Sequence, residues 1–391
     1  VVFPVGGIPP APSNLAAHAP GTNPIQVGWQ EDADNETGFE IQRSTNATTW
    51  QGFATVEANT RTVTDSSAVL GQPYFYRVRA TNTSGFSRFS NVAGATRQSP
   101  VLIAGGTLTT NTTWSPADGT VLVTSMVIVP FGITLTIEAG TLVRLTNRAG
   151  LQATTGGAID VAGSASSKVI FIGANPADMW GGLSAVGTNA SLVVRHADIK
   201  GGFIGATNAT MLIEDTYLHE YKNGGYAIGG CENAVVTLRR CHFRTYHETL
   251  WRASLMVIED SLFEYADNAS SDALDFDGVL PGSIIRRCTF RHGPQTNTDA
   301  IDVGPGLGSV SVDVAIVDSL MYDFPTDGGV SAGEGVWGLT VSNCLIYGCR
   351  GALKCKETPG EPNNPTTMGV YQCTLVDNLV AGFSNYVKSS G

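Results

Sequence analysis

The second half of the chain repeats one short pattern of apolar and polar positions. Each copy alternates apolar and polar residues over a few positions, carries a small residue in its middle and then stops. The apolar positions hold Val, Ile, Leu, Met and Phe, without the three-and-four spacing of an amphipathic helix. Copies recur at intervals of about 20 to 30 residues, as in stacked-coil proteins. The copies span residues 192–199, 211–218, 236–243, 256–263, 283–290, 314–321, 339–346 and 368–375.

This repeat predicts coils of β-strand stacked on one another. Gly, Asn, Asp and Pro fill the intervals between copies, and these residues break helices and form turns. One coil cannot bury its inner face alone, so neighbouring coils must stack around a shared core. Because crossovers between parallel strands are overwhelmingly right-handed, we expect a right-handed parallel β-helix. The small position should form an inward column that holds Ala197, Thr216, Cys241, Ser261, Cys288, Ser319, Cys344 and Cys373.

The first hundred residues follow a different pattern. Strand-sized segments, among them 25–29, 38–43 and 74–80, are separated by clusters of turn residues. With Trp29 and with Tyr74 at the start of its strand, this segment resembles a fibronectin type III domain. The resemblance implies a β-sandwich in which Tyr74 bonds back to the backbone upstream. Such sandwiches serve as spacers, binders or assembly modules, so the resemblance indicates no particular function.

From Val101 onward the chain resembles right-handed parallel β-helix proteins that bacteria secrete. The likeness begins at 106–114 and continues through 132–143, 157–161 and 180–182. Such proteins include pectate, alginate and chondroitin lyases, polygalacturonases, epimerases, phage tailspikes and surface adhesins. The resemblance implies a polysaccharide or cell-surface glycan as partner and an extracellular or cell-surface location. We therefore expect an all-β protein, with a fibronectin type III-like β-sandwich over residues 1–98 and a right-handed parallel β-helix (solenoid) over residues 99–391.

The composition fits a solenoid and limits the partners. Charged residues make up 15% of the chain, against about 25% in an average globular protein. The net charge of −11 argues against nucleic acid or an anionic membrane as partner. No apolar run reaches the length of a transmembrane helix. The last copy lacks an amphipathic cap, and its strand edges predict either a longer chain or self-association.

Four of the seven cysteines belong to the inward column. There we expect them to act as small buried residues. Cys344 and Cys373 lie on consecutive coils, so a disulfide between them is geometrically feasible. The spacing of the cysteines is not that of a zinc site.

One strand per coil carries an unusual acidic pattern in the C-terminal part of the chain. It recurs at 272–278, 299–304, 328–334 and 351–357. Stacked strands lie about 4.8 Å apart, so equivalent side chains on successive coils should be close neighbours. Because side chains alternate faces along a strand, one set should point outward into solvent. That set contains Asp275, Asp277, Asp302, Ser331, Lys354 and Lys356.

Carboxylates this close repel one another and need a cation, a shared proton or an ammonium group. Ca²⁺ bound by Asp275, Asp277 and Asp302 would clamp a sugar carboxylate. Asp275 and Asp302 would alternatively act as acid and base on a glycosidic bond. In a lyase, Lys354 would be the base and Ca²⁺ would acidify the sugar proton that it removes.

Two other interpretations remain open. The stretch 297–302 is similar to the Asn-Thr-Asp-Gly motif of polygalacturonases and would make Asp299 catalytic, but the other motifs of that family are missing. Asp272, Asp299 and Asp327 would otherwise form Asx-turns beside a solvated face. The protein would then be a non-catalytic surface or adhesive rod, with the sandwich as spacer. A groove walled by the turns 267–271 and 358–367 would favour an enzyme, and a flat exposed strip would favour the rod.

Overall fold

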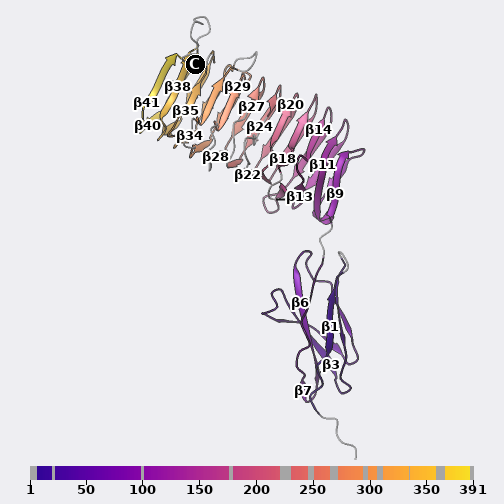
Figure 1. The fold of residues 1–391 in the computed structure, drawn as a ribbon. Coiled ribbons are helices and arrows are strands. Elements are labelled where there is room, and N and C mark those ends of the chain that lie inside the picture. The colour runs from indigo at the N-terminus through magenta and orange to yellow at the C-terminus, as the bar shows by residue number, and fades with distance from the viewer. Residues whose placement is uncertain are drawn as a thin grey trace, which may run out of the picture. The chain divides into compact units, whose positions relative to one another are not determined.

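The chain forms two separate compact units, Val1–Pro100 and Val101–Gly391. The computed structural model in Figure 1 describes residues 7–19, 23–97, 101–175, 179–220, 230–244, 251–264, 272–293, 298–305, 311–333, 335–357 and 366–387. Within these residues every element is a strand apart from the 3-10 helix η1 (Pro116–Asp118). The all-β fold class is therefore confirmed. In the same ranges, no helix is long and apolar enough to cross a membrane.

The first unit is a β-sandwich of antiparallel sheets. One sheet contains, in spatial order, β1 (Ser13–His18), β2 (Ile25–Gln30) and β5 (Thr62–Asp65). The other contains β4 (Gln51–Glu57), β3 (Gly38–Ser44), β6 (Pro73–Asn82) and β7 (Gly85–Phe86), and β8 (Ala93–Thr96) pairs with β6.

The sandwich closes around the residues that its sequence pattern places inside. Trp29, Phe39 and Tyr76 are buried in one apolar cluster. The backbone N–H of Val69 donates to the Tyr74 hydroxyl at 3.4 Å, which is the upstream contact that the resemblance implies. These features agree with a fibronectin type III-like fold.

The second unit is a parallel β-helix whose strands form rows along the stack. The first row contains β10 (Thr112–Trp114), β12 (Thr134–Glu138), β15 (Ala158–Ala162), β18 (Ser191–Arg195), β21 (Thr210–Glu214), β24 (Val235–Arg239), β27 (Leu255–Glu259), β30 (Ile284–Arg286), β33 (Ala315–Val317), β36 (Leu339–Ser342) and β39 (Met368–Tyr371).

The second and third rows share a starting strand. The strands β9 (Val101–Thr107) and β11 (Thr120–Val129) pair with each other, and β11 pairs with the next strand of both rows. The second row continues with β13 (Leu142–Leu145), β16 (Val169–Gly173), β19 (Ala197–Lys200), β22 (Tyr217–His219), β25 (His242–Arg244), β28 (Leu262–Glu264), β31 (Thr289–Arg291), β34 (Leu320–Tyr322), β37 (Leu345–Tyr347) and β40 (Thr374–Val376).

The third row carries the acidic pattern at its C-terminal end. Its first part contains β14 (Gly150–Thr154), β17 (Gly182–Val186), β20 (Ile204–Thr207), β23 (Cys231–Glu232) and β26 (Trp251–Arg252). Its second part is a parallel sheet of β29 (Leu274–Asp277), β32 (Ile301–Gly304), β35 (Gly328–Ala332), β38 (Gly351–Glu357) and β41 (Ala381–Val387). The backbone N–H of Ala253 donates to the carbonyl of Gly278 at 2.8 Å and links the two parts.

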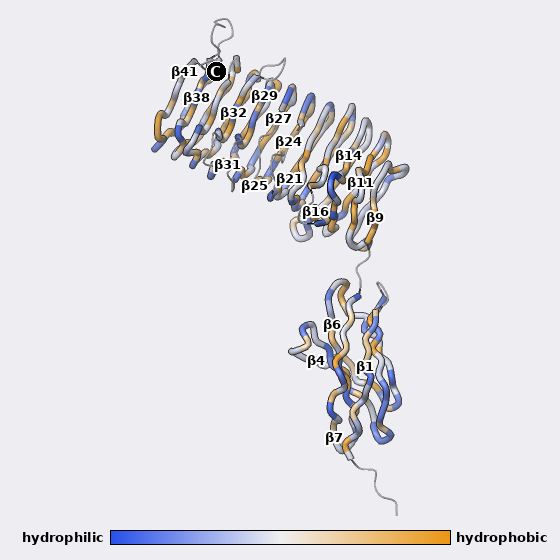
Figure 2. The backbone as a smooth tube through the Cα atoms, viewed as in Figure 1, coloured by the Kyte–Doolittle hydropathy of each residue, from blue (hydrophilic) through white to orange (hydrophobic). Residues whose placement is uncertain are grey.

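A corner residue with positive φ joins the first row to the second in each coil from His196 onward. Asp215 and Arg240 adopt φ values of 51°, and equivalent residues of later coils do the same. The N–H of Asp215 donates to the carbonyl of Arg239 on the next coil at 3.1 Å. Each repeated segment of the sequence is therefore two strands that meet at a corner. Figure 2 shows that apolar stretches recur in coil after coil around this arrangement.

The small residue after each corner points into the core, as predicted. The residues of this column from Ala197 to Cys344 are buried, and Cys373 is half-buried. Thr216, Ser261 and Ser319 donate to backbone carbonyls at 2.7–2.8 Å. All the cysteines are free thiols, so the disulfide considered between Cys344 and Cys373 is absent.

Stacked phenylalanines fill the core beside this column. The rings of Phe243, Phe263 and Phe290 lie on successive coils, with centroids 4.8 and 4.6 Å apart. All three side chains are fully buried. Removal of the central ring would leave a cavity that the neighbouring coils cannot fill without shifting.

We expect Phe263→Ala to lower the free energy of unfolding of the β-helix by about 3–5 kcal/mol, because a large buried side chain is lost. Phe263→Leu keeps most of the apolar volume and should cost clearly less. Chemical denaturation of the three proteins measures the difference. A loss for Phe263→Ala no larger than that for Phe263→Leu would contradict this packing.

Candidate functional site

The acidic pattern aligns across the C-terminal sheet of the third row. Asp275 on β29 lies opposite Asp302 on β32, which lies opposite Ser331 on β35. Ser331 in turn lies opposite Lys354 on β38, and Lys354 opposite Ser384 on β41. The structure thus brings Asp275, Asp302 and Lys354 into the one column that the sequence predicts.

The expectation that this column faces open solvent is wrong. Asp275 is 8% exposed, Lys354 is 7% exposed and Ser331 is fully buried. Part of the reason is that the Lys354 side chain lies along the sheet. A Cβ atom on Gly328 would lie 2.8 Å from Lys354 Cε, so the absent side chain of Gly328 leaves room for the lysine. The flat exposed strip that would have favoured a rod is not formed.

Lys354 is held between carboxylates that come from turns before the strands. Its Nζ atom lies 2.9 Å from Asp299 Oδ1 and also contacts Asp327. The side chains of Lys354 and Asp299 are almost fully buried, whereas that of Asp327 is partly exposed. These three residues, here called the lysine triad, balance a buried ammonium with carboxylates.

The prediction of Asx-turns fails for Asp272. Its Oδ1 atom accepts the backbone N–H of Asp299, on the next coil, at 2.5 Å. Burial and the charges of Asp299 and Asp302 raise the pKa of Asp272 to about 8. Asp272 thus holds a proton at neutral pH and joins two coils.

Lys356 is the cation nearest to Asp302. Its Nζ atom lies 3.6 Å from Asp302 Oδ1, and this oxygen accepts no hydrogen bond within the described residues. Burial raises the pKa of Asp302, although the charge of Lys356 opposes the shift. Asp277 lies beside Gly304, where a Cβ atom would be 3.1 Å from Asp277 Oδ1.

The predicted calcium ligands do not form a ready-made metal centre in the described part of the chain. Within those ranges no group of three or more His, Cys, Asp or Glu side chains is placed to hold a metal ion. The ammonium group of Lys356 already lies beside Asp302, at 3.6 Å. A calcium ion at Asp275, Asp277 and Asp302 would have to compete with Lys356.

A pocket of about 320 Å³ opens over the lysine triad. Of the turns 267–271 and 358–367, expected as walls of a groove, residues 267–271 and 358–365 lie outside the described residues. The pocket combines carboxylate, guanidinium, ammonium and hydroxyl groups with a small apolar wall. Its lining includes Thr326, Asp327, Arg350, Lys354, Val380 and Ser384.

Sequence reasoning did not identify Arg350 or the pairing of Lys354 with Asp299 and Asp327. Arg350 directly precedes β38, and its side chain is exposed. Its position just before the strand that carries Lys354 was the available signal. The pairing had no such signal. Asp299 is 55 residues from Lys354 in the sequence, and the two meet only because the long lysine side chain extends across the sheet.

Comparisons with known proteins add little to the fold. The sequence matches no protein-family model and no curated protein. Similar solved structures include a set of titin domains (16% identity, TM-score 0.22) and a β-1,2-glucanase from Parabacteroides distasonis (23% identity, TM-score 0.22). A Fn3-like protein from Clostridium thermocellum is also similar (23% identity, TM-score 0.21).

These likenesses are partial. They cover 23%, 25% and 22% of this chain, in the same order, and 32%, 14% and 92% of the other chains. The chain thus spans less than a third of the titin fragment and of the glucanase. At these TM-scores no argument about function rests on them.

The raised pKa of Asp272 predicts how pH affects stability. Folding raises this pKa from its ordinary value of 3.8 to about 8. The stability that comes from the bound proton is complete below about pH 4 and is lost as the pH rises to about 8. We expect the unfolding midpoint of the β-helix to fall less between pH 4 and pH 8 in Asp272→Asn than in wild type.

Calorimetry at a series of pH values measures this difference. Asp313→Asn, on an exposed turn residue, is the matched control and should keep the wild-type slope. The same slope in Asp272→Asn and wild type would show that Asp272 does not hold a proton in the folded protein.

Proposed function

We propose that the β-helix binds a polysaccharide outside the cell or at the cell surface, in the pocket over the lysine triad. The observation that carries the proposal is the pocket itself, in which charged and hydroxyl groups converge beside a small apolar wall. Sugars present hydroxyl groups that such side chains bind and small apolar faces that such walls cover.

The groups of the pocket favour an acidic sugar. Arg350 presents an exposed guanidinium, which binds a carboxylate through paired hydrogen bonds. The partly exposed carboxylate of Asp327 accepts hydrogen bonds from sugar hydroxyls, and the hydroxyl of Ser384 donates or accepts them. A polymer of uronate residues supplies all these partners.

The geometry supports binding better than catalysis. A lyase base must reach the proton that it removes, whereas Lys354 is buried between Asp299 and Asp327. Asp275 is also buried, so an acid–base pair with Asp302 would need the sheet surface to open. Catalysis by Asp275, Asp302 and Lys354 is therefore the second hypothesis. Calcium at Asp275, Asp277 and Asp302 belongs to that hypothesis.

The binding proposal is tested by titration calorimetry of the full chain with polygalacturonate and with a neutral dextran. We expect Arg350→Ala to weaken polygalacturonate binding about tenfold or more, because a charged hydrogen-bonding pair is lost. Arg144→Ala, which removes an exposed arginine on β13, is the control and should bind like wild type.

Two results would contradict the binding proposal. One is the absence of polygalacturonate binding by the wild type. The other is an equal loss of affinity in Arg350→Ala and Arg144→Ala, which would show attraction by overall charge and no defined pocket. Dextran binding as tight as polygalacturonate binding would overturn the preference for an acidic sugar.

A separate experiment tests catalysis and calcium. Polygalacturonate is incubated with the protein, with and without Ca²⁺, and unsaturated ends and reducing ends are measured. We expect no turnover, and we expect Ca²⁺ to leave the unfolding midpoint unchanged in wild type and in a double variant with Asp275→Ala and Asp302→Ala. Ca²⁺-dependent unsaturated ends that are lost in Lys354→Met would instead establish a lyase, and reducing ends without unsaturated ends would establish a hydrolase.

A further inference from the structure

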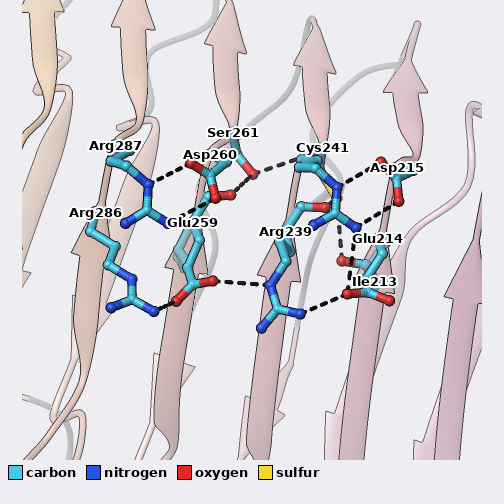
Figure 3. Close-up of polar contacts among 12 residues, drawn as sticks. Ile213, Glu214, Asp215, Arg239, Cys241, Glu259, Asp260, Ser261, Arg286 and Arg287 are labelled. Carbon is cyan, nitrogen blue, oxygen red and sulfur yellow. Dashed lines mark hydrogen bonds and ion pairs between the residues drawn. The ribbon is translucent and has the colours of Figure 1, made fainter.

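Charged residues alternate in sign from coil to coil along one corner of the β-helix. One row runs through the ends of the first-row strands, and the other runs through the corner residues beside them (Figure 3). The strand-end row contains Arg195, Glu214, Arg239, Glu259 and Arg286. The corner row contains His196, Asp215, Arg240, Asp260, Arg287 and Asp318. The four coils from Glu214 to Arg287 thus each carry a pair of like charges and alternate in sign.

The ion pairs in the strand-end row run continuously across the coils. Arg239 donates to Glu214 on one side at 2.9 Å and to Glu259 on the other at 3.0 Å. Arg286 contacts the second oxygen of Glu259, and Arg195 lies 3.5 Å from Glu214. Glu259 is thereby buried between two guanidinium groups.

The contacts in the corner row are paired. Arg240 binds both oxygens of Asp215 at 2.8 Å, and Arg287 binds both oxygens of Asp260 at 2.6 and 2.9 Å. These hydrogen bonds lower the pKa of Asp215 and of Asp260. Both carboxylates therefore remain charged to more acidic pH than usual.

The inward column follows the same two-coil period on the other side of the backbone. The acidic coils carry a hydroxyl, at Thr216 and Ser261, and the basic coils carry a thiol, at Cys241 and Cys288. Ser261 Oγ accepts the backbone N–H of Cys241 at 3.1 Å, across one coil step. The hydroxyl or thiol inside each of these coils and the sign of the charges outside it thus alternate with the same two-coil period.

We propose that these two rows form a register key, by which we mean a charge pattern that stabilises the native order of coils. It destabilises a slip by one coil, in which a coil pairs with the next but one. The apolar core does not make this distinction well, because its residues on neighbouring coils, such as Phe243, Phe263 and Phe290, are alike. A slip by one coil would place Glu-Asp against Glu-Asp or Arg-Arg against Arg-Arg. Like charges directly opposite on paired strands are destabilising, and the rows would repeat that contact at each step.

The register key is tested by exchanging the charges of coils. In the half-inverted variant, Arg239→Glu and Arg240→Asp place one acidic coil between acidic neighbours. In the fully inverted variant, those two changes are combined with E214R, D215R, E259R, D260R, R286E and R287D, and with Arg195→Ala and Asp318→Ala at the two ends, so that the alternation returns with opposite sign and meets no like charge beyond the inverted coils. A neutral variant with Arg239→Ala and Arg240→Ala controls for the loss of ion pairs without repulsion.

We expect the half-inverted variant to unfold at a lower temperature than the neutral variant, by about 5 °C or more. The fully inverted variant should recover most of that loss despite its ten substitutions. Adding 1 M NaCl should narrow the gap between the half-inverted and neutral variants, because salt screens exposed charges.

Two results would overturn the register key. A fully inverted variant as unstable as the half-inverted one would show that individual residues matter and their alternation does not. A half-inverted variant as stable as the neutral one would show that repulsion between coils is negligible. If the half-inverted variant does not fold at all, the fully inverted variant still decides, since only the alternation of charge predicts that it folds.

Discussion

The hydrogen bonding of each coil onto the next in fixed register is the interaction on which the rest of this structure depends. Parallel strands about 4.8 Å apart place equivalent residues of successive coils directly above one another. Every column of the β-helix follows from that constraint. The stacked phenylalanines, the inward hydroxyls and thiols, the alternating charges at the corner and the acidic column of the third row are all products of the same register.

This register also explains how a sequence of low charge builds a charged site. Asp272 and Asp299 lie on successive coils, and close packing of carboxyl groups in a buried place is costly unless protons or cations balance them. The structure uses both solutions, with a proton on Asp272 and the ammonium of Lys354 between Asp299 and Asp327. In the resulting arrangement Lys354 is buried and Asp327 is partly open, which suits recognition of a ligand better than proton transfer to it.

Features that depend on local pattern were predictable from the sequence, and features that depend on side-chain reach were not. The small residue of each repeat, such as Cys288, points inward because strand alternation and stacking leave no other arrangement. The column of Asp275, Asp302 and Lys354 followed from the same logic. Its burial did not, because that depends on where the four-carbon chain of Lys354 lies. The alternating charges at the corner were visible in the sequence, but their contacts required the positions of the corner residues.

The most direct test of the central claim is a crystal structure of the full chain with a bound oligogalacturonate. The account predicts a sugar carboxylate on the Arg350 guanidinium, in the pocket, with Lys354 still between Asp299 and Asp327. Binding of the sugar on another face of the coils would contradict it. So would a complex in which Lys354 has left its carboxylates to contact the sugar ring, because the site would then be catalytic machinery and not a preformed binding pocket.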